Sequence, residues 1–136
     1  MLRTRGREYA LQLLYETDTT AVPLSLALPR FWGHFADTSD ARDFTESLVT
    51  GVAAHSTELD QLIERTSTNW RLERMPYVDR NVLRLAAYEL THSPEIPVAV
   101  VINEAVELGK RYGSQESGAF INGILDRMAH EVGRTK

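Results

Sequence analysis

Apolar residues recur at three- and four-residue steps along most of the chain, the spacing that places side chains on one face of an α-helix. Residues 96–112 show this pattern most clearly, with an apolar face made of Val98, Val101, Ile102, Ala105, Leu108 and Tyr112. Pro97 suits the first turn of a helix, where the N–H that proline lacks would have no partner. Because the many β-branched residues favour a strand by propensity, the helical prediction rests on spacing and on the polar opposite side. We expect a core helix here.

The remaining helices are predicted from the same periodicity. They are expected over residues 7–17, from N-cap candidates at 37–40 as far as Thr66, over 79–91 with Asp79 as the cap, and from Ser114 to about Val132. The stretch that reaches Thr66 should be the longest helix. Pro23 and Pro29 interrupt residues 19–37, so only a short helix over 29–35 is expected there. No segment keeps the period of a strand for more than about four residues, which predicts an all-α fold.

The length of 136 residues suits one domain, residues 1–136, which can bury a core without cross-links. There is no cysteine, which excludes disulfides, thiolate metal sites and cysteine nucleophiles and gives no indication of secretion. The apolar runs fall far short of the roughly 20 residues of a membrane span, and the N-terminus lacks the apolar segment of a signal peptide. We expect a cytoplasmic protein without a membrane contact.

The net charge of −4 would by itself argue against a nucleic-acid partner, but the charges are unevenly distributed. Residues 1–8 hold three arginines and one glutamate, and residues 65–84 hold five arginines and two acids. Between them, residues 16–64 hold nine acids and two arginines. Two basic segments therefore flank an acidic one.

Residues 1–6 have little apolar content, so we expect a flexible basic arm ahead of the first helix. Arg3, Arg5 and Arg7 would then stand at the N-terminus of that helix, whose free N–H groups and dipole favour phosphate. Such an arm is either an anion-binding site or a disordered, solubilising terminus, and both interpretations stay open.

Two groups of aromatic residues could stack on nucleic-acid bases. The first is Phe31, Trp32 and Phe35. Closely spaced aromatics beside prolines are more typical of a small satellite core, although a protein-only scaffold or homodimer would also use them. The second is Trp70, in an expected linker over residues 67–76, where Arg71 and Arg74 flank it. This tryptophan either stacks on a ligand or clamps the linker onto the core.

Phe120 lies at the border of the buried stripe of the last helix. At about 100° per residue it shares a line with Glu116, Gly123 and Arg127. A glycine in the middle of a helix, such as Gly123, lowers helix stability by roughly 1 kcal/mol relative to alanine. Its presence makes sense if a ligand or another backbone approaches there. Phe120 is therefore either available to a partner or packed under a neighbouring loop.

Known catalytic motifs are missing from the sequence. The C-terminal glycines lack the lysine and the preceding strand of a phosphate-binding loop, and neither a nucleophile elbow nor a zinc-binding HExxH occurs. No paired metal spacing is found among the four histidines, His34, His55, His92 and His130. His55 falls alone in an apolar series. We predict no metal, no cofactor and no enzyme.

Several runs of sequence resemble the NusB family of bacterial transcription antitermination factors. They are RGREYALQLLYE at residues 5–16, VDRNVLRLAAYEL at 78–90, IPVAVVINEAVELGKRYG at 96–113 and SGAFINGILDRM at 117–128. The resemblance implies an all-α domain of about six to seven helices in two packed bundles. It also implies a protein that binds boxA-type single-stranded RNA in ribosomal RNA leader transcripts, together with the ribosomal protein NusE and the transcription elongation complex.

The resemblance also implies roles for individual residues. By position, the RNA-binding residues of the family fall on Arg3, Arg5, Arg7, Glu116 and Phe120. Arg127 shares the line of Phe120 and joins this set. The region of Tyr15 and Asp79 resembles the surface that faces NusE. The competing function class is a protein-only helical scaffold or homodimer without direct RNA contact.

Overall fold

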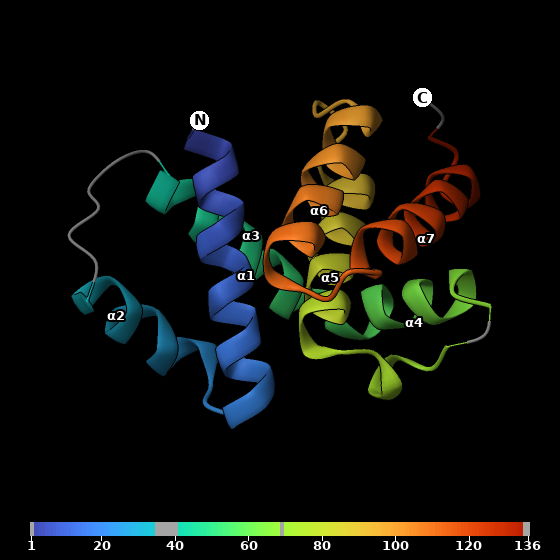
Figure 1. The fold of residues 1–136 in the computed structure, drawn as a ribbon. Helices are drawn as coiled ribbons and strands as arrows, with labels where there is room; N and C mark the ends of the chain where they lie inside the picture. Colours follow the sequence, from blue (N-terminus) through green and yellow to red (C-terminus); the bar gives the residue numbers. More distant parts are fainter. Residues whose placement is uncertain (1, 35–40, 69, 135–136) are drawn as a thin grey trace.

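The computed structural model describes residues 2–34, 41–68 and 70–134, and this part of the chain is built from helices alone (Figure 1). In chain order the elements are α1 (Leu2–Thr20), α2 (Leu24–His34), α3 (Ala41–Ala54), α4 (Ser56–Thr66), the short 3₁₀ helix η1 (Leu72–Arg74), α5 (Tyr77–His92), α6 (Val98–Tyr112) and α7 (Ser117–Glu131). Within the described ranges there is no strand, and the predicted all-α fold is confirmed. None of these helices combines the length and the apolar character that a membrane crossing requires.

The helices form two groups, and α5 joins them. In one group α1 packs on α3 and α2; in the other, α4, α6 and α7 pack around α5 and on one another, with α6 beside α7 (Figure 1). The helix α5 also packs on α1 and α3, so it has protein on most of its sides. Its buried residues accordingly include Asn81 and Glu89 as well as the expected apolar stripe.

The two C-terminal helices match their predictions closely. Pro97 caps α6, and its carbonyl accepts the first hydrogen bonds of the helix from the N–H groups of Val100 and Val101. The predicted apolar faces of α6 and α7 are buried except at Tyr112, which is 47% exposed, and the two helices meet closely at Gly109. A Cβ placed on Gly109 would lie 2.5 Å from Ile121 Cδ1, so the absence of a side chain is what lets the two helices approach.

The expected N-terminal arm is a helix instead, because α1 already begins at Leu2. Gly6 is buried where α1 crosses α3, and its carbonyl accepts a 2.8 Å hydrogen bond from the Thr45 hydroxyl. A Cβ on Gly6 would stand 2.7 Å from the Phe44 ring. The prediction of a flexible arm was wrong because polar composition did not reveal these tertiary contacts.

The predicted long helix ending at Thr66 is two helices, α3 and α4, and α1 is longer than either at 19 residues. The break falls at His55, whose backbone leaves the helical region at φ −117° and ψ 23°. The corner turns α4 onto α5 and α7, while α3 stays against α1 and α5. The single apolar series of the sequence is therefore divided between two helices that pack against different neighbours. The N-cap candidates at 37–40 lie outside the described residues.

The helix around the two prolines is longer than the short helix over 29–35 that was predicted. The helix α2 starts after Pro23, whose carbonyl accepts its first hydrogen bonds, and it contains Pro29 inside. Phe31 and Trp32 are buried and meet the Tyr9 ring edge-on at 5.7 Å each. They belong to the main hydrophobic core and not to the separate satellite core that was expected, and they are not exposed for a scaffold or homodimer contact. Phe35 lies outside the described residues.

Candidate nucleic-acid interface

The N-terminal half of α7 and the segment after α4 enclose a surface hollow of about 350 Å³. We call it the aromatic hollow; its lining includes Thr68, Trp70, Phe120, Gly123 and Arg127. Trp70 is 49% exposed, and Phe120 is partly buried at the helix border, where the 100° counting placed it. The two ring centroids lie 5.8 Å apart at an interplanar angle of 78°. Two aromatic side chains distant in sequence thus meet edge to face in the lining of the hollow.

Arg127 forms the basic wall of the aromatic hollow. Its Nε donates a 2.9 Å hydrogen bond to the carbonyl of Thr66, the last residue of α4, which orients the guanidinium group. A Cβ built on Gly123 would meet only Arg127 Nη1, at 3.9 Å. Among the described residues, no backbone atom of another element lies within 4 Å of this Cβ, so the missing side chain leaves the hollow open.

A second, smaller hollow of about 140 Å³ lies on the other side of the same aromatic pair. Trp70 and Phe120 line it together with Pro76, Asp79, Ser114 and Glu116. The exposed Glu116 is the N-cap residue of α7. Its carboxylate can only accept hydrogen bonds when ionised, which suits the amino groups of bases and disfavours phosphate.

Asp79 does not fit the partner surface that was predicted for it, because it is only 4% exposed. The Ser117 hydroxyl donates a 2.7 Å hydrogen bond to Asp79 Oδ1, and the backbone N–H of Ser114 donates to the same hydroxyl. Burial raises the pKa of Asp79 above its usual value, although the bond from Ser117 acts in the opposite direction. The residue holds the start of α7 against α5. It is neither exposed nor the cap of α5, whose N-cap is Pro76.

Arg7 is also buried, with 3% of its surface exposed, so the prediction that it contacts RNA phosphate is not supported. Its Nε and Nη2 donate to the two carboxylate oxygens of Glu89 at 2.9 and 2.7 Å, and Nη1 donates to Glu104 at 3.1 Å. Burial lowers the pKa of Arg7, but these two carboxylates outweigh it and the pKa ends above its usual value. The guanidinium group ties α1 to α5 and α6.

Arg3 and Arg5 are exposed on the first turns of α1. Residues four apart share a helix face, so Arg3 and Arg7 both lie over the Phe44 ring, at 5.2 and 5.3 Å, while Arg5 points elsewhere. The helix α6 separates α1 from α7 (Figure 1). The structure therefore brings Glu116, Phe120 and Arg127 together but leaves Arg3 and Arg5 on the far side of α6.

Sequence reasoning missed two basic residues between these regions, Lys110 and Arg111 in the last turn of α6. Both are exposed. A Cβ on Gly118 would lie 3.0 Å from Lys110 Cγ, so the lysine stem runs across the start of α7. Arg111 donates to Glu8 of α1. The available signal was the position of these cations on the polar side of the clearest predicted helix.

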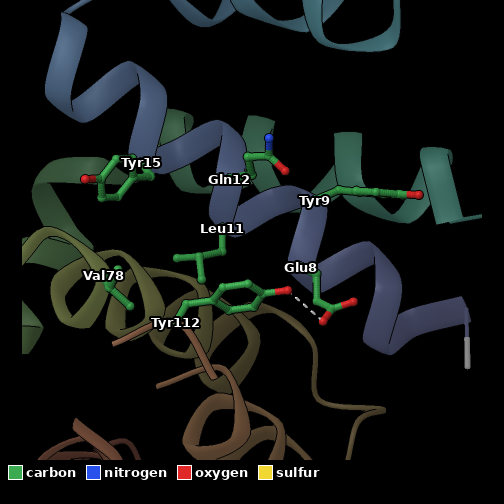
Figure 2. A pocket seen from close by; sticks show the side chains of 7 residues that line it. All are labelled: Glu8, Tyr9, Leu11, Gln12, Tyr15, Val78 and Tyr112. Carbon is green, nitrogen blue, oxygen red and sulfur yellow. Dashed lines mark hydrogen bonds between the residues drawn. The ribbon is translucent and has the colours of Figure 1, made fainter. Parts of the chain in front are cut away.

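Tyr15 borders a separate groove of about 420 Å³ between α1, the start of α5 and the end of α6 (Figure 2). We call it the Tyr15 groove; it is lined by Glu8, Tyr9, Leu11, Gln12, Tyr15, Val78 and Tyr112. Tyr15 is 43% exposed and contacts the Tyr77 ring edge-on at 5.9 Å. At the other end, the Tyr112 hydroxyl donates a 3.0 Å hydrogen bond to Glu8, as Figure 2 shows. The groove has an apolar floor, and the carboxylate at its edge, Glu8, is paired with Arg111.

The fold and these surfaces define an all-α protein of two helix groups, with an aromatic and basic face on one side and an apolar groove on another. A family model described as the NusB family matches residues 4–130, and the chain belongs to that family.

Named relatives agree with this assignment. The transcription antitermination protein NusB of Anaeromyxobacter dehalogenans strain 2CP-1 is 56% identical over 128 residues, covering 93% of this chain and 89% of the relative. The T. maritima NusB structure is 38% identical with a TM-score of 0.87, covering 95% of this chain and 91% of that one. A crystal structure of the antitermination factors NusB and NusE in complex with dsRNA holds a chain 27% identical, with a TM-score of 0.87 and coverage of 96% and 97%.

Proposed function

We propose that this protein is a cytoplasmic, non-catalytic transcription antitermination factor. It binds boxA-type single-stranded RNA of ribosomal RNA leader transcripts together with the ribosomal protein NusE, and it acts in the transcription elongation complex. The names of its NusB relatives and the NusB–NusE–RNA composition of a structural neighbour support this proposal. The observation that carries it in this chain is the pairing of the exposed Trp70 with the partly buried Phe120 beside Arg127.

The aromatic hollow suits unstacked bases better than a continuous duplex. Each base that stacks on an aromatic side chain contributes roughly 1–3 kcal/mol, whatever its identity, and single strands expose both faces of their bases. Trp70 and Phe120 offer two such surfaces, and Arg127 and Lys110 supply charge for the phosphates. Glu116 at the edge of the smaller hollow would accept a hydrogen bond from a base amino group.

The charge distribution predicts that the protein alone binds RNA weakly. The chain carries a net charge of −4, and its proposed phosphate contacts are few. For a single strand, the slope of log K against log salt is roughly −0.7 per phosphate contacted, so few contacts give a shallow slope. Arg3 and Arg5 add a second contact only if the RNA crosses α6, where Lys110 and Arg111 lie.

The Tyr15 groove is the surface that we assign to NusE. It offers an apolar floor for side chains of a partner, and the Glu8 carboxylate at its edge is already paired with Arg111. A basic partner bound there would add positive charge to the complex. This arrangement accounts for an acidic RNA-binding protein that works with a partner.

The experiment is a fluorescence anisotropy titration of a labelled boxA-like single strand, with a scrambled strand and a base-paired duplex as competitors. Phe120→Ala and Trp70→Ala should each weaken binding about 5- to 150-fold, the equivalent of roughly 1–3 kcal/mol, while retaining a cooperative unfolding transition. Leu26→Ala is the matched control, because Leu26 is an exposed apolar side chain on α2. The double variant should lose less than the sum if both rings hold one base.

The same titration can overturn the proposal. Unchanged binding by both ring variants would remove the aromatic hollow from the RNA site. Tighter binding of the duplex than of the single strand would replace single-stranded recognition with a double-stranded one. A titration with NusE added should strengthen RNA binding by the wild type, and Tyr15→Glu should abolish that gain without changing binding of RNA alone.

A further inference from the structure

Three metal-binding side chains meet where α4 begins and α5 ends. His55 precedes α4, Glu58 lies in its first turn, and His92 is the last residue of α5. Glu58 Oε1 lies 3.9 Å from His55 Nδ1 and 3.6 Å from His92 Nε2. One ligand atom from each residue falls within 4.8 Å of the other two. His55, which the sequence showed as a lone histidine, thus has a second imidazole at 4.1 Å between ring centroids.

The His92 ring turns its Nε2 toward this cluster and its Nδ1 toward Thr91. When the Thr91 hydroxyl donates its proton to the Ala87 carbonyl at 2.8 Å, it accepts a hydrogen bond from His92 Nδ1, which lies 2.7 Å away. In the neutral ring the lone pair is then on Nε2, the atom that faces Glu58. The Tyr88 ring stacks on the imidazole at 4.9 Å and 11°, which restrains its plane. A hydrogen bond at the second ring nitrogen, such as the one between His92 Nδ1 and Thr91, is common in metal-bound histidines.

We propose that His55, Glu58 and His92 bind a zinc ion, or a late first-row divalent cation of similar preference, with water completing the coordination. Two imidazoles and one carboxylate are a common three-residue set for zinc, whereas magnesium and calcium prefer oxygen ligands alone. Ligands of a tetrahedral zinc site stand roughly 3.4 Å apart, given bonds of about 2.0–2.2 Å. The Glu58 contacts need to close by less than about 1 Å, and Glu58 is exposed enough to move.

A bound ion would link two helices that come from different parts of the chain. Two of its ligands belong to the start of α4 and one to the end of α5. Arg127 contacts the opposite end of α4, at Thr66. The helix has 11 residues at about 1.5 Å each, so roughly 15 Å separate the metal site from the aromatic hollow. The inference therefore stands apart from the proposed RNA binding.

The test is isothermal titration calorimetry of the chelator-treated full chain with zinc chloride at pH 7.5. One ion should bind per chain, and His92→Ala and His55→Ala should each weaken binding at least about tenfold, since a three-residue site loses a ligand. His130→Ala is the matched control, because His130 is exposed in the last turn of another helix, α7. Magnesium chloride should give no binding, and zinc should raise the unfolding temperature of the wild type and of His130→Ala but not of the two site variants.

The pH dependence provides a second readout. Zinc displaces protons from the ligand atoms that it binds, so zinc affinity should fall between pH 7.5 and pH 5.5. Cobalt substitution should give the visible absorption of a tetrahedral site in the wild type and not in His92→Ala. The inference is overturned if no ion binds, if both histidine variants bind zinc like the wild type, or if His130→Ala weakens binding as much as they do.

Discussion

The first turns of α1 and the first turns of α7 were both expected to contact RNA, and the structure treats them differently. At the start of α7, Glu116 and Phe120 share one surface with Arg127 from the same helix. At the start of α1, Arg3 is exposed while Arg7, on the same face, is buried with two carboxylates. A basic residue beside a helix terminus is thus no guide to phosphate binding until its tertiary neighbours are known.

The largest expected effect would test this difference directly. Arg7→Ala leaves Glu89, 2% exposed, as an unpaired buried charge, and should lower the free energy of unfolding by roughly 3–5 kcal/mol. Its matched control, Arg3→Ala, removes an exposed arginine over the same Phe44 ring and should change stability by less than about 0.5 kcal/mol. Urea unfolding measures both. If Arg7→Ala were as stable as the wild type and lost only RNA affinity, Arg7 would return to the RNA site.

A smaller effect concerns Gly123 on the α7 side. Gly123→Ala should raise the free energy of unfolding by up to about 1 kcal/mol, because alanine favours the helix and the added Cβ meets only Arg127 Nη1 at 3.9 Å. The same methyl group enters the aromatic hollow and should weaken binding of single-stranded RNA several-fold. Thermal unfolding and RNA titration separate the two effects. A stabilised variant with unchanged RNA affinity would show that no base occupies the hollow.

The smallest effect concerns how Asp79 anchors the start of α7. Burial raises its pKa in the folded state, so the folded state holds this proton more tightly. The corresponding stability is full below the unfolded pKa and is lost as pH rises through the folded value. Asp79→Asn should therefore gain stability relative to the wild type between pH 3 and pH 7, by less than about 1 kcal/mol.

Asp18 provides the opposite case as a control. Burial alone would raise its pKa, but hydrogen bonds from Arg80 and Asn81 and the charge of Arg84 lower it overall. Its stability contribution is present above the unfolded pKa and lost as pH falls through the folded value. Asp18→Asn should lose stability at pH 7 and approach the wild type in acid. Urea midpoints measured across this pH range would refute both assignments if the two variants changed in the same direction.

Several features of the fold could be predicted because they depend on local spacing. The apolar stripes of α6 and α7 and the border position of Phe120 follow from a periodicity close to 3.6 residues. The same local patterns failed at His55, where one apolar stripe continues across a corner between two helices. The periodicity of apolar residues shows which face of a helix is buried, but it does not show whether the helix axis stays straight.

The sequence by itself determined that the chain is helical, which faces are buried and that its motifs resemble the NusB family. Only the tertiary structure decided which distant residues meet: Trp70 with Phe120, His55 with His92, and Arg7 with Glu89. The reason is physical, since helix formation and burial patterns depend on neighbours three or four residues away, whereas each of these pairs joins different elements. Their chemistry arises from the packing of those elements against one another, which a single sequence does not display.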